Sequence, residues 1–251
     1  MQRISEILRP LQGDFGLYVL DSNGDVLLSE QASTRFPLAS AAKVAVGWAI
    51  TQRVLDGTLD WQQKISELVF DPKEDSADVY PHLQGLHEYE LRDVVEVMIA
   101  CHDGNCANGL ANLIGGWGVV QSDIAQKYPR VSVHQAARDE ERNSAELAEM
   151  VRMVQEIVKS YPRTPSLWKP VLAGLVRQQD KTDDIPRHRL MNMTGGLATA
   201  MIDVGVMGSI HDGNYIVYGI AGKNLADRAS APTTDEAFAE VLRQLYLVTL
   251  P

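Results

Sequence analysis

A serine and a lysine three residues apart give this chain its clearest chemical signal. Ser40 and Lys43 stand at the start of an apolar run, residues 41–50, that predicts a buried helix. Positions i and i+3 share one face of a helix, so the amine can reach back to the hydroxyl. A serine becomes a nucleophile when a base takes its proton, and burial lowers the pKa of a lysine. The pair predicts acyl transfer through Ser40, with a capping serine beside a solvated lysine as the alternative.

Strands are predicted at both ends of the chain. Residues 14–21 and 25–30 are rich in β-forming residues, and Asn23-Gly24 between them supplies the positive φ that a hairpin turn needs. Three more strands are predicted near the C-terminus, at residues 191–194, 200–208 and 214–221. The simplest packing joins both ends into one antiparallel five-stranded sheet.

The middle of the chain is predicted to be mostly helical, because its apolar residues recur at helical spacing. Asn143-Ser144-Ala145-Glu146 is typical of a capping box that opens a helix through Val158. The other helices predicted here cover residues 91–99, 107–114 and 165–177. Amphipathic segments at residues 4–11 and from Thr234 onward are expected to be terminal helices that cover a face of the sheet.

These elements predict an α/β (α+β) fold with a five-stranded antiparallel sheet, terminal helices and a mostly helical lobe. We expect residues 1–55 and 185–251 to form the sheet domain and residues 56–184 the helical domain, as one discontinuous two-lobed unit. A cleft between such lobes is where a binding site is expected.

Composition limits the partners. The chain has 251 residues, 45% of them hydrophobic, which is ample for a sizeable core. Its formal net charge of −10 argues against nucleic acid or an anionic membrane as the main partner. The sequence has no apolar run long enough to span a membrane. Its first residues lack the apolar core and cleavage site of a signal peptide, so we expect a cytoplasmic protein.

The two cysteines, Cys101 and Cys106, have the spacing of neither a C-x-x-C motif nor a zinc site. Two free thiols suit a reducing compartment. We expect small buried hydrophobic residues, with a redox pair or a nucleophile as the alternative. No metal site or cofactor is expected.

Taken together, the chain resembles the serine β-lactamase and penicillin-binding-protein family, most closely the class A β-lactamases. Residues 36–43, Phe-Pro-Leu-Ala-Ser-Ala-Ala-Lys, reproduce the family's F-x-x-x-S-x-x-K. Residues 98–107 occupy the place of the second motif, S-D-N or S-x-N, and Met193-Thr194-Gly195 that of the third, K-T-G or K-S-G. The motifs come in the family's order, and the resemblance covers nearly the whole chain.

The resemblance implies a role for each matching residue. Ser40 is the nucleophile, Lys43 is its base, and Asn105 holds the substrate amide and the lysine. Thr194 donates a hydrogen bond to a substrate carboxylate, and the pair Gly195-Gly196 lets a ligand approach the strand closely. The backbone N–H groups of Ser40 and Gly196 form the oxyanion hole.

The second motif departs from the family. Aligned on Asn105, the serine that relays a proton toward the leaving group is replaced by Asp103. Either Asp103 or His102 can shuttle protons in its place. The alternative is that residues 102–105 form only a turn.

Two further departures weaken the case for a lactamase. Met193 replaces the lysine with which the family binds the substrate carboxylate. The loss of one charge-assisted hydrogen bond weakens substrate binding by about 1.5–3 kcal/mol. Arg187 and Arg189 are candidate replacements, or simply surface charge. No E-x-x-L-N loop, whose glutamate directs the deacylating water in class A enzymes, is found between residues 116 and 143. The glutamates there, Glu140 and Glu141, are expected in a solvated turn.

We therefore expect a serine hydrolase of the β-lactamase-like superfamily. It would form an acyl-enzyme with an amide or ester of a small-molecule or peptide-like substrate, as a weak β-lactamase without a cofactor. One alternative is a catalytically inactive protein that keeps the fold for ligand binding or interaction. Another is a glutaminase-like amidohydrolase, which also uses S-x-x-K on this fold. The sequence leaves the oligomeric state open.

Overall fold

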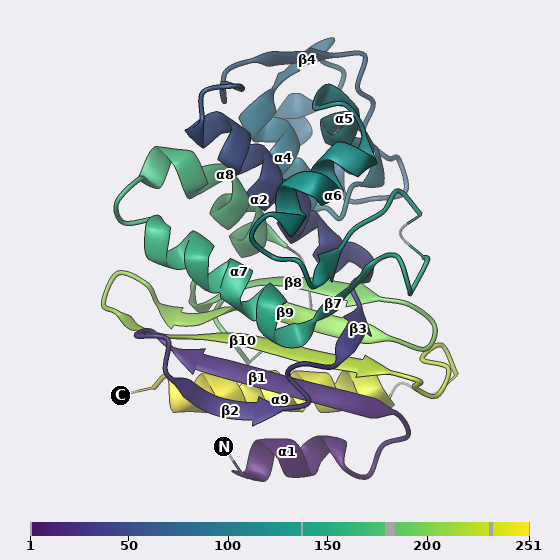
Figure 1. The fold of residues 1–251 in the computed structure, drawn as a ribbon, viewed down its shortest axis with the longest axis vertical. Helices are drawn as coiled ribbons and strands as arrows, with labels where there is room; N and C mark the ends of the chain where they lie inside the picture. The colour runs from purple at the N-terminus through teal and green to yellow at the C-terminus, as the bar shows by residue number, and fades with distance from the viewer. Residues whose placement is uncertain (1, 137, 179–183, 231–232, 251) are drawn as a thin grey trace.

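Both ends of the chain meet in one antiparallel sheet. The computed structural model describes residues 2–136, 138–178, 184–230 and 233–250. The sheet has the order β2-β1-β10-β9-β8, so the N-terminal hairpin lies beside the C-terminal strands (Figure 1). Its strands are β1 (Asp14–Asp21), β2 (Val26–Glu30), β8 (Leu190–Gly196), β9 (Met201–Ser209) and β10 (Asn214–Lys223). The predicted five-stranded sheet is confirmed, and β8 lies at its edge.

A tight turn joins the first two strands. The Asp21 carboxylate accepts the backbone N–H groups of Asn23, Gly24 and Asp25 at 2.8–2.9 Å. Gly24 has a φ of +104°, a conformation that glycine adopts without steric cost. The turn predicted at Asn23-Gly24 therefore sets the register of β1 against β2.

Helices cover both faces of the sheet. Helices α1 (Gln2–Leu8) and α9 (Thr233–Val248) lie side by side on one face, and α7 (Leu147–Ser160) crosses the other (Figure 1). Alternate residues of β1 pack into different cores. Leu17 belongs to the core on the α1 and α9 side of the sheet, and Tyr18 to the core on the α7 side. Because successive side chains of a strand point to opposite faces, a strand buried on both sides must be apolar throughout.

Helix α2 (Ala42–Leu55) runs through the centre of the helical part, and its first ten residues are all buried. Around it pack α4 (Leu91–Ala100), α5 (Gly104–Leu113), α6 (Trp117–Ala125) and α8 (Pro165–Arg177). A Cβ at Gly174 would lie 2.7 Å from the Ile99 Cβ, so this glycine lets α8 approach α4 closely. The prediction of a mostly helical middle is confirmed.

Short strands tie this part together. Strand β3 (Arg35–Pro37) pairs with β7 (Ser144–Glu146), which also pairs with β6 (Val131–Ser132). Strand β4 (Lys64–Ser66) pairs with β5 (Glu88–Glu90). The chain between these two strands includes a single turn of helix, α3 (Ser76–Val79).

The capping box predicted at residues 143–146 is wrong. Residues 144–146 are a strand, because β3 and β6 supply hydrogen-bond partners that are distant in the sequence. Helix α7 begins only at Leu147, and Asn143 Oδ1 accepts the His134 N–H at 2.7 Å. The division into domains at residues 55 and 185 stays a prediction.

Cys101 and Cys106 are free thiols buried in the core, as expected. Burial raises the pKa of both thiols, which keeps them protonated and unreactive. Among the helices of the described ranges, none has the length and apolar character required to cross a membrane.

Candidate active site

Ser40 lies on a short 3₁₀-helix, η1 (Ala39–Ala41), that leads directly into α2. Ala39 has a φ of +44°, a strained conformation for a residue with a Cβ. The turn is pressed against strand β8, where a Cβ at Gly195 would lie 2.2 Å from the Leu38 carbonyl oxygen. Only glycine fits at residue 195, so this glycine lets β8 approach the Ser40 turn closely. The close approach of a ligand at Gly195-Gly196 stays a prediction.

Lys43 lies one turn along the helix from Ser40, as the spacing predicts. Lys43 Nζ is 3.3 Å from Ser40 Oγ, within hydrogen-bond distance. The lysine is only 9% exposed, and burial lowers its pKa, opposed in part by the charges of Glu74 and Asp103. A buried amine with a lowered pKa beside a hydroxyl is suited to take its proton.

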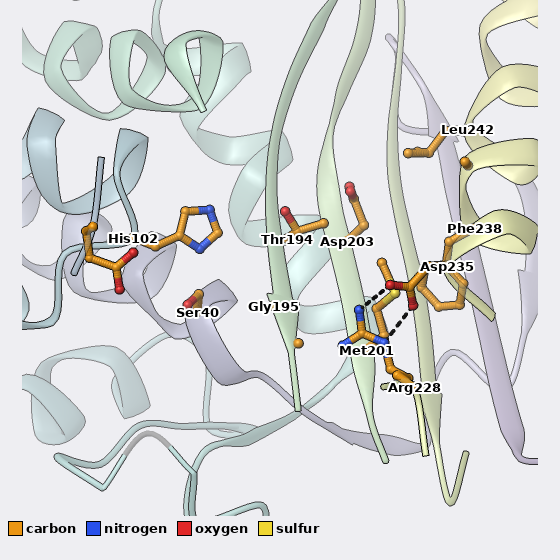
Figure 2. A pocket seen from close by; sticks show the side chains of 13 residues that line it. Ser40, His102, Thr194, Gly195, Met201, Asp203, Arg228, Asp235, Phe238 and Leu242 are labelled. Atoms are coloured by element: carbon orange, nitrogen blue, oxygen red, sulfur yellow. Dashed lines mark hydrogen bonds and ion pairs between the residues drawn. The ribbon is translucent and has the colours of Figure 1, made fainter. Parts of the chain in front are cut away.

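A cavity of about 680 Å³ opens beside Ser40. Figure 2 shows Ser40 and His102 on the helical side, facing Thr194 and Gly195 of strand β8. The cavity continues past the edge strand toward α9. Its other described lining residues are Glu74, Gly196, Met201, Asp203, Arg228, Asp235, Phe238, Ala239 and Leu242.

His102 lies between helices α4 and α5 with a φ of +56°. Its Nε2 is 3.1 Å from Gln178 Nε2, and the same amide donates to Thr194 Oγ1 at 2.8 Å. Gln178 thus links the two walls of the cavity. Burial, followed by the nearby charge of Lys43, lowers the pKa of His102 to about 4, so its ring is neutral at neutral pH.

Asp103 has a structural position. It is completely buried, and its Oδ1 accepts the Cys106 N–H at 2.8 Å as the N-cap of α5. Its Oδ2 accepts the Asp71 N–H at 2.8 Å. Both oxygens therefore hold backbone groups, and Asp103 is not among the described residues that line the cavity. These contacts favour His102 over Asp103 as the residue that faces a substrate.

The structure does not bring Asn105 to Ser40. Asn105 is exposed in the first turn of α5, and its Nδ2 donates to the Val69 carbonyl at 3.1 Å. The reason is the helix start: because Asp103 is the N-cap, it matches the aspartate of S-D-N. His102 then takes the place of the motif serine and Gly104 that of its asparagine. The motif therefore lies one residue earlier in the chain than the alignment on Asn105 placed it.

Only part of the third motif faces the cavity. Met193 is completely buried in the core, whereas Thr194, Gly195 and Gly196 line the cavity. Arg187 and Arg189 are not among the described lining residues. Arg187 Nη2 instead donates to the Val176 carbonyl at 2.9 Å.

The arginine that does line the cavity is Arg228, in the segment after β10. Its Nε and Nη2 contact the two oxygens of Asp235 at 2.7 and 2.8 Å (Figure 2). Its Nη1 donates to the Leu197 carbonyl at 3.1 Å. A Cβ at Gly196 would lie 2.4 Å from Arg228 Nη1, so this glycine makes room for the guanidinium. Arg228 lies outside all three motifs, and no local pattern marks it.

Asp203 of β9 is a second lining residue without a sequence signal. It is buried, and it accepts hydrogen bonds from Asn192 Nδ2 at 2.8 Å and Tyr218 Oη at 2.7 Å. In the sheet register it lies opposite Thr194. The cavity wall next to β8 thus carries a carboxylate that the sequence did not indicate.

The model of the beta-lactamase enzyme family matches residues 1–248. The chain belongs to this family. The resemblance inferred from the three motifs is therefore confirmed, and the protein is related to serine hydrolases of the β-lactamase superfamily.

Solved structures confirm the fold. A β-lactamase from Chitinophaga pinensis aligns with a TM-score of 0.81 at 18% identity, over 99% of this chain and 98% of the other. A β-lactamase from Xanthomonas campestris gives 0.76 at 22%, over 97% and 96%. The structure of PBP-A gives 0.77 at 18%, over 98% and 95%. A comparison with curated proteins finds no match.

Proposed function

We propose that this protein is a serine hydrolase in which Ser40 forms an acyl-enzyme. The observation that carries the proposal is the position of Lys43 Nζ, 3.3 Å from Ser40 Oγ beside an open cavity. Membership of the β-lactamase family supports it.

Acylation begins when Lys43 takes the proton of Ser40 and Oγ attacks the substrate carbonyl. The backbone N–H groups of Ser40 and Gly196 stabilise the oxyanion. His102, at the place of the family's second-motif serine, accepts this proton from Lys43 and passes it to the leaving group. Because its pKa is about 4, the imidazolium formed in transit is a strong proton donor.

The proposed substrate is an amide or ester of a small-molecule or peptide-like acid, with only weak β-lactamase activity. Met193 offers no charge to a substrate carboxylate. Arg228 lines the cavity, but Asp235 already occupies its guanidinium. The solved acyl-enzyme complex of a PBP-A mutant with penicillin G supports a covalent adduct as the first product to look for.

The test is covalent labelling followed by intact mass measurement. The protein is incubated with a fluorescent penicillin and, separately, with short p-nitrophenyl esters. We expect an adduct that is lost in Ser40→Ala and retained in Ser29→Ala, whose serine is exposed on strand β2. If the wild-type protein shows neither adduct nor turnover with any of these reagents, the proposal is overturned.

The second candidate is a ligand-binding protein without catalysis. The position of Asn105 outside the cavity and the buried Met193 favour it, because two polar substrate contacts of the family are then missing. Reversible binding of penicillin or an ester product, without adduct or turnover, would support this candidate.

A further inference from the structure

Glu74 reaches the Ser40 cavity from a loop that belongs to none of the three motifs. The loop precedes α3, and the Glu74 N–H donates to the Asp71 carbonyl at 3.1 Å. Glu74 is half-buried and is the one glutamate among the described residues that line the cavity. Within the described ranges, its carboxylate makes no hydrogen bond or ion pair.

The start of α5 fixes this loop. Asp103 Oδ2 accepts the Asp71 N–H at 2.8 Å, and Asn105 Nδ2 donates to the Val69 carbonyl at 3.1 Å. Both anchoring residues lie within three residues of His102 in the sequence. The second-motif segment therefore presents His102 to the cavity and holds the loop that presents Glu74.

The charges around Glu74 suit proton transfer. Burial raises the pKa of its carboxyl, and the nearby amine of Lys43 lowers it in part. The carboxylates of Asp71, Asp103 and Asp75 raise it further. A carboxylate whose pKa is moved toward neutrality is a better general base at neutral pH than an unperturbed one.

The other acidic groups near the site are less suited. Asp203 and Asp235 are held by hydrogen bonds and an ion pair. Glu140 is exposed and lines a neighbouring groove with Gly196 and Arg228, not the Ser40 cavity. Glu141 is exposed too.

We propose that Glu74 is the general base that activates water for hydrolysis of the Ser40 acyl-enzyme. This proposal rests on the proposed function. Class A enzymes take this base from the E-x-x-L-N loop, which this sequence lacks. Here Glu74 would provide the base from a different loop.

The step balances within the site. Glu74 takes a proton from water, and the water oxygen forms a bond to the acyl carbon. Glu74 passes this proton to the neutral amine of Lys43, and Lys43 protonates Ser40 Oγ as the bond from the acyl carbon to Oγ breaks. The products are a carboxylic acid and free Ser40, with Glu74 ionised and Lys43 neutral again.

The experiment compares Glu74→Gln with Glu140→Gln as a matched control. Each protein is given a short pulse of penicillin or ester, excess reagent is removed, and intact mass follows the adduct over time. We expect Glu74→Gln to acylate at nearly the wild-type rate but to lose the adduct about 100-fold more slowly or worse, the scale of general base catalysis. Glu140→Gln should match the wild type, and Glu74→Asp should recover part of the rate.

Each outcome decides one point. An adduct on Glu74→Gln that decays as fast as on the wild type overturns the role of Glu74 while leaving the proposed function intact. A slower acylation in Glu74→Gln with unchanged decay also overturns it. The absence of both adduct and turnover in the wild type and in Glu74→Gln overturns the proposed function itself. Thermal unfolding of each variant shows that the comparison is between folded proteins.

Discussion

Asp103 and Asp71 join the two segments that present His102 and Glu74 to the cavity. Asp103 Oδ2 accepts the Asp71 N–H at 2.8 Å, while its Oδ1 accepts the Cys106 N–H at 2.8 Å. The carboxylate is completely buried, so solvent cannot replace these contacts. One side chain therefore caps a helix and positions a loop at the same time.

Asp103→Ala should lower the free energy of unfolding by about 2–4 kcal/mol. The lost helix cap costs ~1 kcal/mol, and a buried N–H without a partner costs ~1–3 kcal/mol. Asp103→Asn, which keeps one acceptor oxygen, should fall between this variant and the wild type. Urea denaturation measures the change, with Asp25→Ala as a control because Asp25 is exposed. Equal unfolding midpoints for Asp103→Ala and the wild type would contradict the structural role.

Lys43→Met should remove acylation of Ser40 and stabilise the fold at neutral pH. The amine is 9% exposed, and its burial disfavours the charged form. A methionine of similar length removes that cost, because burying an ionisable amine is unfavourable and burying a thioether is not. Intact mass and thermal unfolding check the two halves of this prediction.

The stabilisation by Lys43→Met should shrink as the pH rises. The folded pKa of Lys43 is lowered below 10.5, so between these two pKa values the unfolded chain binds the extra proton and wild-type stability increases with pH. Below the folded pKa the penalty is fully present, and above 10.5 it vanishes. Urea denaturation of both proteins at several pH values tests the sign, and a difference that grows with pH would show that Lys43 is not destabilised by burial.

His102→Ala should separate substrates by their leaving groups. Amide hydrolysis needs a proton on the departing nitrogen, and we expect its kcat to fall about 100-fold. Hydrolysis of a p-nitrophenyl ester, whose leaving group departs as an anion, should change little. Steady-state kinetics on one acyl group with both leaving groups makes the comparison, with the exposed His87→Ala as a control. Equal losses on both substrates would assign His102 a positioning role instead.

The sequence predicts elements whose causes are local. Strand β1 has the predicted bounds, Asp14–Asp21, because its β-forming residues and the following Asn-Gly turn act over a few residues. The contact of Lys43 with Ser40 is likewise local, since i and i+3 share a helix face.

What the sequence missed depends on distant partners. Residues 144–146 became a strand because Arg35–Pro37, more than a hundred residues earlier, pairs with them. The sequence alone does not show which polar residue caps α5, so the motif could be aligned on Asn105. The structure identifies Asp103 as the cap, because its side chain is buried and accepts the Cys106 N–H. Arg228 reaches the cavity through the packing of the segment after β10 against Gly196, which no motif encodes.

Substitutions of Arg228 and of Asp235 should have opposite effects on the acylation rate of substrates that carry a carboxylate. Arg228 contacts both oxygens of Asp235, which is 45% exposed, so the acid competes with a substrate for the guanidinium. Asp235→Asn should release Arg228 and raise the rate of acylation by penicillin about tenfold, whereas Arg228→Gln should lower it about 10–100-fold, the scale of one charge-assisted hydrogen bond. Neutral p-nitrophenyl esters should respond to neither change, because they have no carboxylate to bind. Second-order acylation rates of the three proteins with both reagents decide it: if Arg228→Gln slows ester and penicillin equally, Arg228 supports the fold of the cavity and does not bind the substrate carboxylate.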